Sequence, residues 1–236
     1  MGRLPDRTRL RKRLRRWRRP AWLGSARRTT PLSDVWGWDR GEPVDRYYIE
    51  RFLERHRGAI RGHVLEVKDP AYTRQLGSNV THSDVLDIAV DNPRATIVAD
   101  LCTADAIRSD TFDCFILTQT LQFIYDVPAA LFHAHRILRP GGTLLCTAPT
   151  VSRIEHGALE HEYWRFTSAG LERLVKDAFI GGDVEVRSFG NVLTSVAFLL
   201  GMARQELSER ELDRDQPYFP LIVCGRATKA PVPGPR

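Results

Sequence analysis

Carboxylates accompany three successive apolar runs of this chain. They are Glu66 near the end of 63–67, Asp84 within 80–88, and Asp100 directly after 95–99. A carboxylate accepts hydrogen bonds from two donors at once, so acids in these places could hold a ligand rich in donor groups. A single Asp is more often a helix cap or a turn former, and Glu66 could be a structural carboxylate at the sheet edge. A purely structural role is less attractive for the three acids jointly than for any one of them, because all three accompany successive strand-like runs.

Polar side chains also follow a fourth apolar run, residues 112–118. They are Thr118, Gln119, Thr120 and Gln122. This pattern is typical of a strand end that lines a ligand. For Gln122, an exposed helix position is an equally good interpretation.

A cluster of chemically capable residues occupies positions 160–164. His161 is the candidate general base, because an imidazole titrates near neutral pH. The acids Glu160 and Glu162 on either side could keep it charged instead, and a surface histidine is the more frequent case. Tyr163 and Trp164 offer flat aromatic faces for a sugar or ring substrate, or they belong to the core.

These residues lie on a chain in which strand-like and helix-like stretches alternate. The patterns predict helices from Pro43 to Gly58, after the N-cap Asp126, and after the N-cap Thr167. The predicted strands are 63–67, 80–88, 95–99, 112–118, 143–148, 184–189 and 221–227. This alternation predicts an α/β fold, a doubly wound, mostly parallel seven-stranded sheet flanked by helices. Such sheets bind ligands beyond the carboxyl ends of their strands.

The length and composition fit one such domain. The chain has 236 residues, of which 42% are apolar. The most apolar stretch, 192–202, is shorter than the roughly 18 residues that span a bilayer and predicts a buried helix. No secretory signal is recognised at the start, so a cytoplasmic location is expected. The four cysteines form no Cys-x-x-Cys pair and predict reduced, buried thiols, with no metal site.

The charge is unevenly distributed. Residues 1–30 hold 12 Lys or Arg and one acid, whereas the rest of the chain holds 23 basic and 28 acidic residues. We therefore expect a basic N-terminal arm (1–30), a folded domain (31–228) and a Pro-rich disordered tail (229–236). Within the arm, residues 3–19 could form a short amphipathic helix that contacts an anionic membrane surface or nucleic acid. A solvated tail is the alternative.

In order along the chain, these motifs resemble the class I S-adenosylmethionine-dependent methyltransferase family. They are most similar to the small methyltransferases often associated with glycosyltransferases, over residues 31–228. The stretches that carry the resemblance are PVDRYYIERFL (43–53), HVLEVKDPAY (63–72), SDVLDI (83–88), TIVADL (96–101), FDCFILTQTLQFIYD (112–126), HRILRPGGTLL (135–145) and EYWRFTSAGLERL (162–174). The most specific signal is the stretch 112–126 followed at this spacing by the stretch 135–145.

The resemblance implies a Rossmann-like fold and S-adenosyl-L-methionine as the cofactor. Glu66 matches the acid of the first family motif, but the Gly-x-Gly turn that should follow reads Lys68-Asp69-Pro70. Glycines let the backbone approach a ligand closely, and Pro70 removes an N–H group. The methionine part of the cofactor is then held differently, by Lys68 or Arg46, or its binding is weakened or lost.

The remaining site residues are also implied by the resemblance. Asp84, with Asp87 as its rival, would bind the ribose hydroxyls. Asp100 would meet the adenine amino group, with Leu101 offering its backbone N–H. The cofactor-binding set is therefore Glu66, Val67, Lys68, Asp84, Asp100, Leu101, Thr118, Gln119 and Gln122. His161 would be the base, and Tyr163 and Trp164 would line the acceptor pocket.

The activity implied is methyl transfer to a hydroxyl of a sugar, a glycan or another small molecule. One alternative is a non-catalytic binding module whose Lys68-Asp69-Pro70 loop blocks the cofactor. Another is an RNA methyltransferase that uses the basic arm. A nicotinamide dehydrogenase is disfavoured, because no Gly-x-Gly-x-x-Gly follows the first strand.

Overall fold

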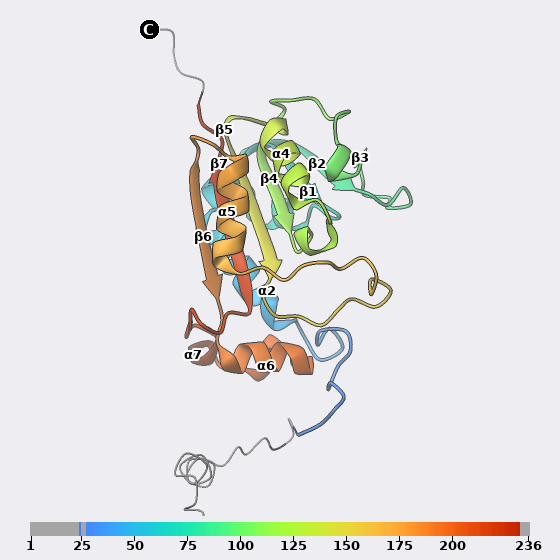
Figure 1. Ribbon diagram of the computed structural model, residues 1–236, viewed down its shortest axis with the longest axis vertical. Helices are drawn as coiled ribbons and strands as arrows, with labels where there is room; N and C mark the ends of the chain where they lie inside the picture. The colour runs from blue at the N-terminus through green and yellow to red at the C-terminus, as the bar shows by residue number, and fades with distance from the viewer. Residues whose placement is uncertain (1–23, 25–26, 232–236) are drawn as a thin grey trace, which may run out of the picture. The chain divides into compact units, whose positions relative to one another are not determined.

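The structure is a computed structural model, and it describes residue 24 and residues 27–231. The amphipathic helix expected at 3–19 and the tail residues 232–236 lie outside the described residues. By its internal contacts the chain divides into two units, 1–31 and 32–236. The second unit holds the sheet and is shown in Figure 1.

The second unit is built on one seven-stranded sheet with the strand order β3-β2-β1-β4-β5-β7-β6. The strands are β1 (Gly62–Val67), β2 (Val80–Asp87), β3 (Ile97–Val98), β4 (Phe112–Thr118), β5 (Leu138–Pro149), β6 (Asp183–Phe189) and β7 (Ile222–Thr228). β7 runs antiparallel to both of its neighbours, and the other neighbouring pairs are parallel. The predicted fold class is thus confirmed. The strand order reverses direction between β1 and β4, which makes the carboxyl ends of these two strands the switch point of the sheet.

Helices cover both faces of this sheet (Figure 1). The helices are α2 (Val44–Arg55), α3 (Ala71–Leu76), α4 (Val127–Ile137), α5 (Ser168–Ala178), α6 (Val192–Leu200) and α7 (Glu209–Leu212), of which α6 and α7 lie at the end to which β5 and β6 point. One core lies between the sheet and α4 with α5, and it contains Phe115, Leu131 and Leu171. The second core lies under α2 and α6 and contains Ile49 and Ile116. This arrangement follows from the apolar residues 114–117 of β4, whose alternate side chains enter opposite cores.

Two predicted helix starts are confirmed in atomic detail. The Asp126 carboxylate accepts a hydrogen bond from Ala129 N at 3.0 Å, and Thr167 Oγ1 accepts one from Gly170 N at 3.1 Å. The strand after α4 begins earlier than predicted, at Leu138 rather than 143. Gly142 permits this, because a Cβ there would lie 2.8 Å from the carbonyl oxygen of Arg139.

Two expectations near the C-terminus are corrected. Lys229, expected at the start of a disordered tail, is held in place: its Nζ donates to Leu138 O and to Asp110 Oδ1, each at 2.7 Å. The helix expected to be buried, α6, buries only one side. Its other side leaves Val192, Val196 and Leu199 each more than 40% exposed. Across the described residues, no helix is long and apolar enough to cross a membrane.

Candidate cofactor and acceptor site

Glu66 lies at the carboxyl end of β1 with its side chain almost fully buried. Its carboxylate accepts three hydrogen bonds, from Tyr72 N at 3.0 Å, Thr73 N at 2.8 Å and Thr73 Oγ1 at 2.6 Å. Burial raises the pKa of Glu66, and the hydrogen bonds from Thr73 and Tyr72 oppose that shift. The carboxylate oxygens therefore bind the first turn of α3, and Glu66 fixes the shape of the loop between β1 and α3.

Lys68 carries the loop through a left-handed turn with a φ of 68°. This is the backbone region that glycine adopts readily and that other residues adopt at a cost. The loop thus makes a glycine-like turn without glycine. Its Lys68 side chain is exposed, and Asp69 forms an ion pair with Arg94.

Asp84 does not lie at the rim of the sheet, which corrects the expectation that it follows β2. It pairs with Leu65 within the sheet, three residues before β2 ends at Asp87. At a rise of about 3.3 Å per residue, it lies roughly 10 Å from that end. Its carboxylate is bound by His63 Nε2 and by Thr96 Oγ1, each at 2.7 Å. The carboxylates of Glu66, Asp84 and Asp100 therefore do not converge on one hollow.

The rival acid Asp87 occupies the carboxyl end of β2. Its Oδ2 accepts a hydrogen bond from Asn92 Nδ2 at 2.6 Å, and the same amide donates to Lys68 O at 2.8 Å. Asn92, which the sequence patterns did not single out, thereby ties the end of β2 to the loop after β1. Asp87 is only partly buried, which leaves part of its carboxylate accessible to a ligand.

Asp100 follows β3 and is exposed. Its Oδ1 accepts a hydrogen bond from Cys102 N at 2.9 Å, so it caps the short 3₁₀ helix Leu101–Thr103. Leu101 is buried beneath it. A cap uses one lobe of the carboxylate and does not exclude a ligand contact through the other oxygen.

The loop after β4 contains a second left-handed residue, Gln119, with a φ of 48°. Its N–H donates to Thr147 O at 2.9 Å, and its carbonyl accepts from Gln122 Nε2 at 3.0 Å. Gln122 is 5% exposed, and its Oε1 has no hydrogen-bond partner among the described residues. Thr118, the last residue of β4, is partly buried.

The aromatic pair predicted to line the acceptor pocket lies against this same loop. Tyr163 N donates to Gln122 O at 2.8 Å, and Trp164 Nε1 donates to Ile124 O at 2.9 Å. The ring of Tyr125 lies 5.2 Å from the ring of Tyr163, between centroids. These three rings are each more than 40% exposed, so they form an aromatic surface and not part of the core.

His161 and its two acidic neighbours have different environments. His161 is exposed, and no described residue hydrogen-bonds its side chain; its backbone N–H donates to Ala158 O. Glu162 instead turns inward and is paired with Arg165 at 2.7 Å. Glu160 is exposed.

A group of buried polar residues at the start of α2 was only partly anticipated. Arg46 Nη1 donates to Tyr72 Oη at 3.2 Å, which joins α2 to the loop held by Glu66. Both Asp45 Oδ1 and Arg46 Nε are buried without a hydrogen-bond partner in the described chain. Burial raises the pKa of Asp45, and Arg46 opposes that shift. Local patterns did not identify Asp45, because its burial results from packing on distant segments.

A further cation follows β5. The Arg153 guanidinium lies 3.9 Å from the ring centroid of Trp36, and its Nε is buried without a partner among the described residues. Trp36 Nε1 donates to Ser152 Oγ at 3.4 Å, so residues around Trp36 cover the loop after β5.

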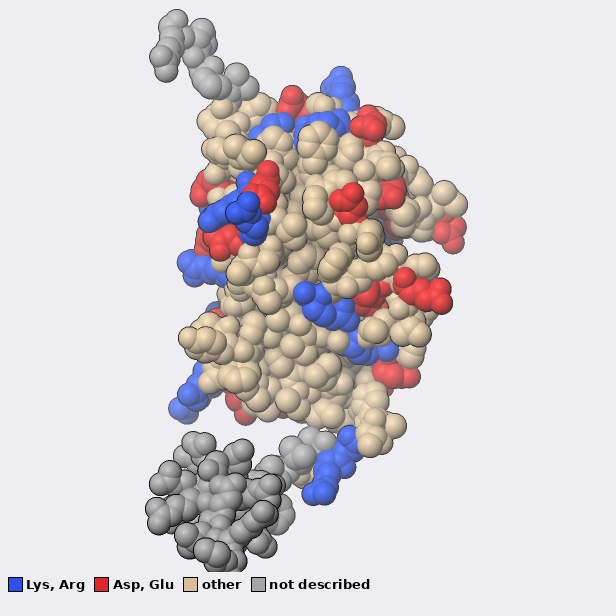
Figure 2. All heavy atoms as spheres, viewed as in Figure 1, with Lys and Arg blue, Asp and Glu red and all other residues tan. Residues whose placement is uncertain are grey.

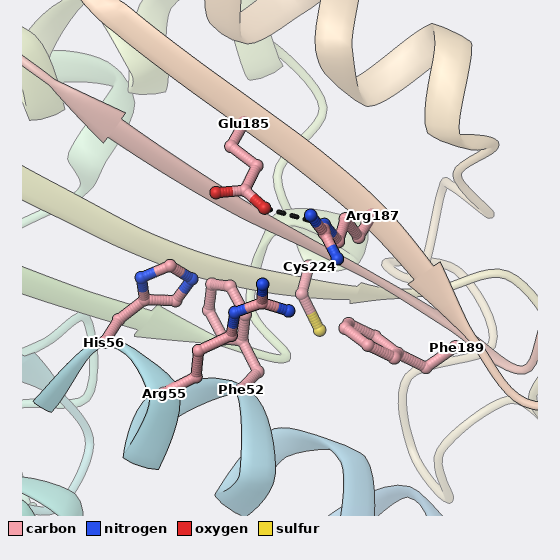
Figure 3. A pocket seen from close by; sticks show the side chains of 7 residues that line it. All are labelled: Phe52, Arg55, His56, Glu185, Arg187, Phe189 and Cys224. Carbon is pink, nitrogen blue, oxygen red and sulfur yellow. Dashed lines mark ion pairs between the residues drawn. The ribbon is translucent and has the colours of Figure 1, made fainter. Parts of the chain in front are cut away.

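The depression shown in Figure 3 lies elsewhere. It is lined by the end of α2 and by side chains of β6 and β7, including His56, Glu185 and the buried Cys224. Glu185 and Arg187, both on β6, pair with each other at 2.6 Å. Because it is narrow and its acid and base are paired with each other, it is not the candidate site.

The residues at the carboxyl rim fit an adenosyl ligand with an amino acid end. Buried polar groups are nearly always hydrogen-bonded, so unpartnered atoms on Asp45, Arg46 and Gln122 indicate a missing polar partner. An anion and a cation side by side match a zwitterion. Asp87 and Asp100, at the ends of the next two strands, offer acceptors for hydroxyl and amino donors.

Comparison with known proteins concerns the domain and its fold. Residues 66–146 match the family model of a methyltransferase domain. A methyltransferase from Archaeoglobus fulgidus is 13% identical, with a TM-score of 0.53, 78% of this chain and 94% of that chain being covered. One from Mesorhizobium loti is 17% identical, with a TM-score of 0.53 and coverages of 82% and 100%. A Haemonchus contortus phosphoethanolamine N-methyltransferase, in complex with S-adenosylmethionine, is 16% identical, with a TM-score of 0.56 and coverages of 78% and 52%.

No curated protein matches the chain. The identities to the solved structures are low, so these likenesses show the fold, while the family model identifies the domain at residues 66–146. The chain therefore has the fold of S-adenosylmethionine-dependent methyltransferases, and residues 66–146 match a methyltransferase domain.

The buried Asp45 predicts a pH-dependent stability. Burial raises its pKa, so the folded state holds the proton to higher pH than the unfolded state does. Ionisation of Asp45 therefore lowers the free energy of unfolding as pH rises above the usual range for an aspartate. Asp45→Asn stays neutral, and we expect it to be more stable than the native chain by about 1 kcal/mol at pH 7, with the difference shrinking towards pH 4.

Urea denaturation at the two pH values measures this difference. The exposed Asp39→Asn serves as the matched control and should show no such trend. An advantage of Asp45→Asn that is the same at pH 4 and pH 7 would contradict the prediction.

Proposed function

We propose that this methyltransferase transfers the methyl group of S-adenosylmethionine to a hydroxyl of a sugar, a glycan or another small molecule. In this proposal residues 31–228 act as the catalytic domain. The observation that carries it is backbone strain at the switch point. Lys68 and Gln119, the residues directly after β1 and β4, are both left-handed, and such strain gathers where a ligand is clamped.

In this assignment the cofactor lies across the ends of β1, β2, β3 and β4. Glu66 shapes the loop that approaches it, with Val67 and Lys68 offering backbone. Arg46 binds its carboxylate, and Asp45 or Gln122 accepts from its amino group. Asp87 takes the ribose role expected of Asp84. Asp100 accepts from the adenine amino group, and Leu101 supplies a backbone N–H.

The bound cofactor supplies an activated methyl group with a neutral leaving group. The chain then has to align the acceptor oxygen with that methyl, which proximity alone can favour by about 7–11 kcal/mol. Thr118 and Gln119 face the methyl in this proposal, and the rings of Tyr163 and Trp164 hold a flat or sugar acceptor. A hydroxyl keeps its proton at neutral pH, so His161 accepts it as the oxygen attacks.

The cofactor assignment predicts a selective loss of binding. Asp87→Asn should weaken binding of S-adenosylhomocysteine about tenfold or more, because an acceptor for the ribose hydroxyls is replaced in part by a donor. Asp84→Asn is the matched control, since it changes an acid on the same strand away from the rim. Isothermal titration calorimetry on both variants and the native chain measures the effect.

Two outcomes would count against the assignment. Equal weakening by both variants would remove the distinction between Asp87 and Asp84. No binding by the native chain, with binding created by Lys68→Gly and Pro70→Gly together, would favour the non-catalytic module. The ion pair that joins Asp69 of that loop to Arg94 is the observation that supports this second candidate.

The assignment of His161 predicts a rate effect without a binding effect. His161→Ala should lower the turnover number about 100-fold, within the usual range for loss of a general base, and leave S-adenosylhomocysteine affinity unchanged. His156→Ala, an exposed histidine of the same loop, is the control. Release of S-adenosylhomocysteine is followed with free and nucleotide-linked hexoses as acceptors. Equal rates for His161→Ala and the native chain would exclude His161 as the base.

A further inference from the structure

The surface of α6 is unusual for a protein in water. Val192, Leu193, Val196 and Leu199 are each between 42% and 46% exposed, on the side of the helix that does not pack on the core. Close by in the chain, Tyr218 is 89% and Phe219 is 55% exposed. Their loop is joined to Gly190, two residues before α6, through the hydrogen bond from Gln216 N to Gly190 O. Exposed apolar surface of this kind marks an interaction site.

Charged groups of both signs border this surface. Arg210 and Arg214 line one hollow together with Val192, Leu193 and the acid Glu211, at the N-terminal end of α6. At the other end of the helix, Leu32 N donates to Leu200 O at 2.7 Å. Residues 1–30, with 12 Lys or Arg and a single acid, are covalently joined to the domain next to this point. In Figure 2 the end of the molecule that carries α6 is largely free of charged side chains.

We propose that the exposed side of α6, with Tyr218 and Phe219, docks onto an anionic lipid surface. Apolar side chains enter the boundary between headgroups and acyl chains, and nearby arginines attract the phosphates. A tyrosine suits such a boundary because its ring is apolar and its hydroxyl is polar. The basic N-terminal residues add long-range attraction, so the apolar contact and the charge act as the two signals that stable anchoring requires.

The position of α6 also indicates which acceptor the enzyme would meet. This inference rests on the proposed function. α6 follows the carboxyl end of β6, and β6 is parallel to β5 because both are antiparallel to β7. The docking side therefore lies at the same end of the sheet as the candidate site. A docked molecule presents that site to the lipid surface, so the acceptor hydroxyl is carried by a membrane-bound amphiphile.

Vesicle co-sedimentation of the full chain tests the docking. Vesicles of phosphatidylcholine with 30% phosphatidylserine are compared with phosphatidylcholine alone. We expect Val196→Glu with Leu199→Glu to lower binding to the anionic vesicles about tenfold or more. Ile180→Glu, an exposed apolar residue after α5, is the matched control and should bind as the native chain does. Removal of residues 1–26 should weaken binding and its dependence on salt.

Three results would overturn the docking. The first is binding to anionic vesicles that the double variant leaves unchanged. The second is no binding by the native chain. The third is a native dimer in light scattering that the double variant converts to monomer without any lipid effect, which would make a second copy the occupant. Calorimetry with S-adenosylhomocysteine on the double variant separates this test from the proposed function, because that affinity should stay native.

Two histidines and an aspartate lie close together on β1 and β2. The register of β1 and β2 places His63 beside His82, and Asp84 follows on the same side of β2. One ligand atom from each of these three residues lies within 4.8 Å of the others. His63 Nε2 is 2.7 Å and His82 Nε2 is 3.6 Å from Asp84 Oδ2. Thr96 orients the same carboxylate through its other oxygen at 2.7 Å.

We infer that His63, His82 and Asp84 bind a divalent transition metal such as Zn²⁺. Two imidazoles and a carboxylate suit this ion, and their atoms need only small shifts to lie about 2.0–2.2 Å from it. The hydrogen bond from Thr96 is the kind of outer contact that fixes a ligating carboxylate. The ion would join β1 to β2 away from the carboxyl rim, so its role is to stabilise the sheet.

Calorimetric titration of chelator-treated protein with zinc sulfate tests this site. The native chain should bind one ion and unfold at a higher temperature with it. His82→Ala should weaken that binding at least about tenfold, and because His82 is exposed the variant should fold. His156→Ala, which alters an exposed histidine paired with Asp34, is the control. Zinc affinity of His82→Ala equal to that of the native chain, or no binding by the native chain, would refute the site.

Discussion

The buried carboxylate of Glu66 is the constraint on which the candidate site depends. A buried charge is tolerated only when hydrogen bonds satisfy it, and here Tyr72 and Thr73 supply three. Those bonds fix the start of α3 against the end of β1, so the residues between them have to turn tightly. Lys68 accordingly adopts a left-handed conformation. Tyr72 is placed at the same time to accept from Arg46, which brings the start of α2 to the rim.

This chain of contacts explains how the loop after β1 makes a glycine-like turn without glycine. The glycine-like turn is enforced from outside the loop, by Glu66 on one side and by Asn92 on the other. The side chain of Lys68 is exposed, so the turn needs its backbone and not its size. The departure at Lys68-Asp69-Pro70 therefore changes the chemistry available at the loop more than it changes the loop's geometry.

Charge and apolar surface are segregated along the same chain. The folded part has more acidic than basic residues, while residues 1–30 are strongly basic. α6, whose composition alone predicts burial, instead leaves much of its apolar surface exposed. The exposed side of α6 is the surface that we propose meets a lipid, and α6 follows the strand end of the sheet where we propose methyl transfer occurs.

The sequence by itself determined the seven-stranded architecture and the caps at Asp126 and Thr167, because periodicity and capping act within a few residues. Tertiary structure decided which acid reaches the rim. Asp84 and Asp87 are equivalent in local pattern, and the pairing of β2 with β1, which continues through Val67 and Leu86, is what leaves Asp84 inside the sheet. The contact of Arg46 with Tyr72 and the exposure of α6 likewise depend on segments distant in the chain, whose meeting no local pattern encodes.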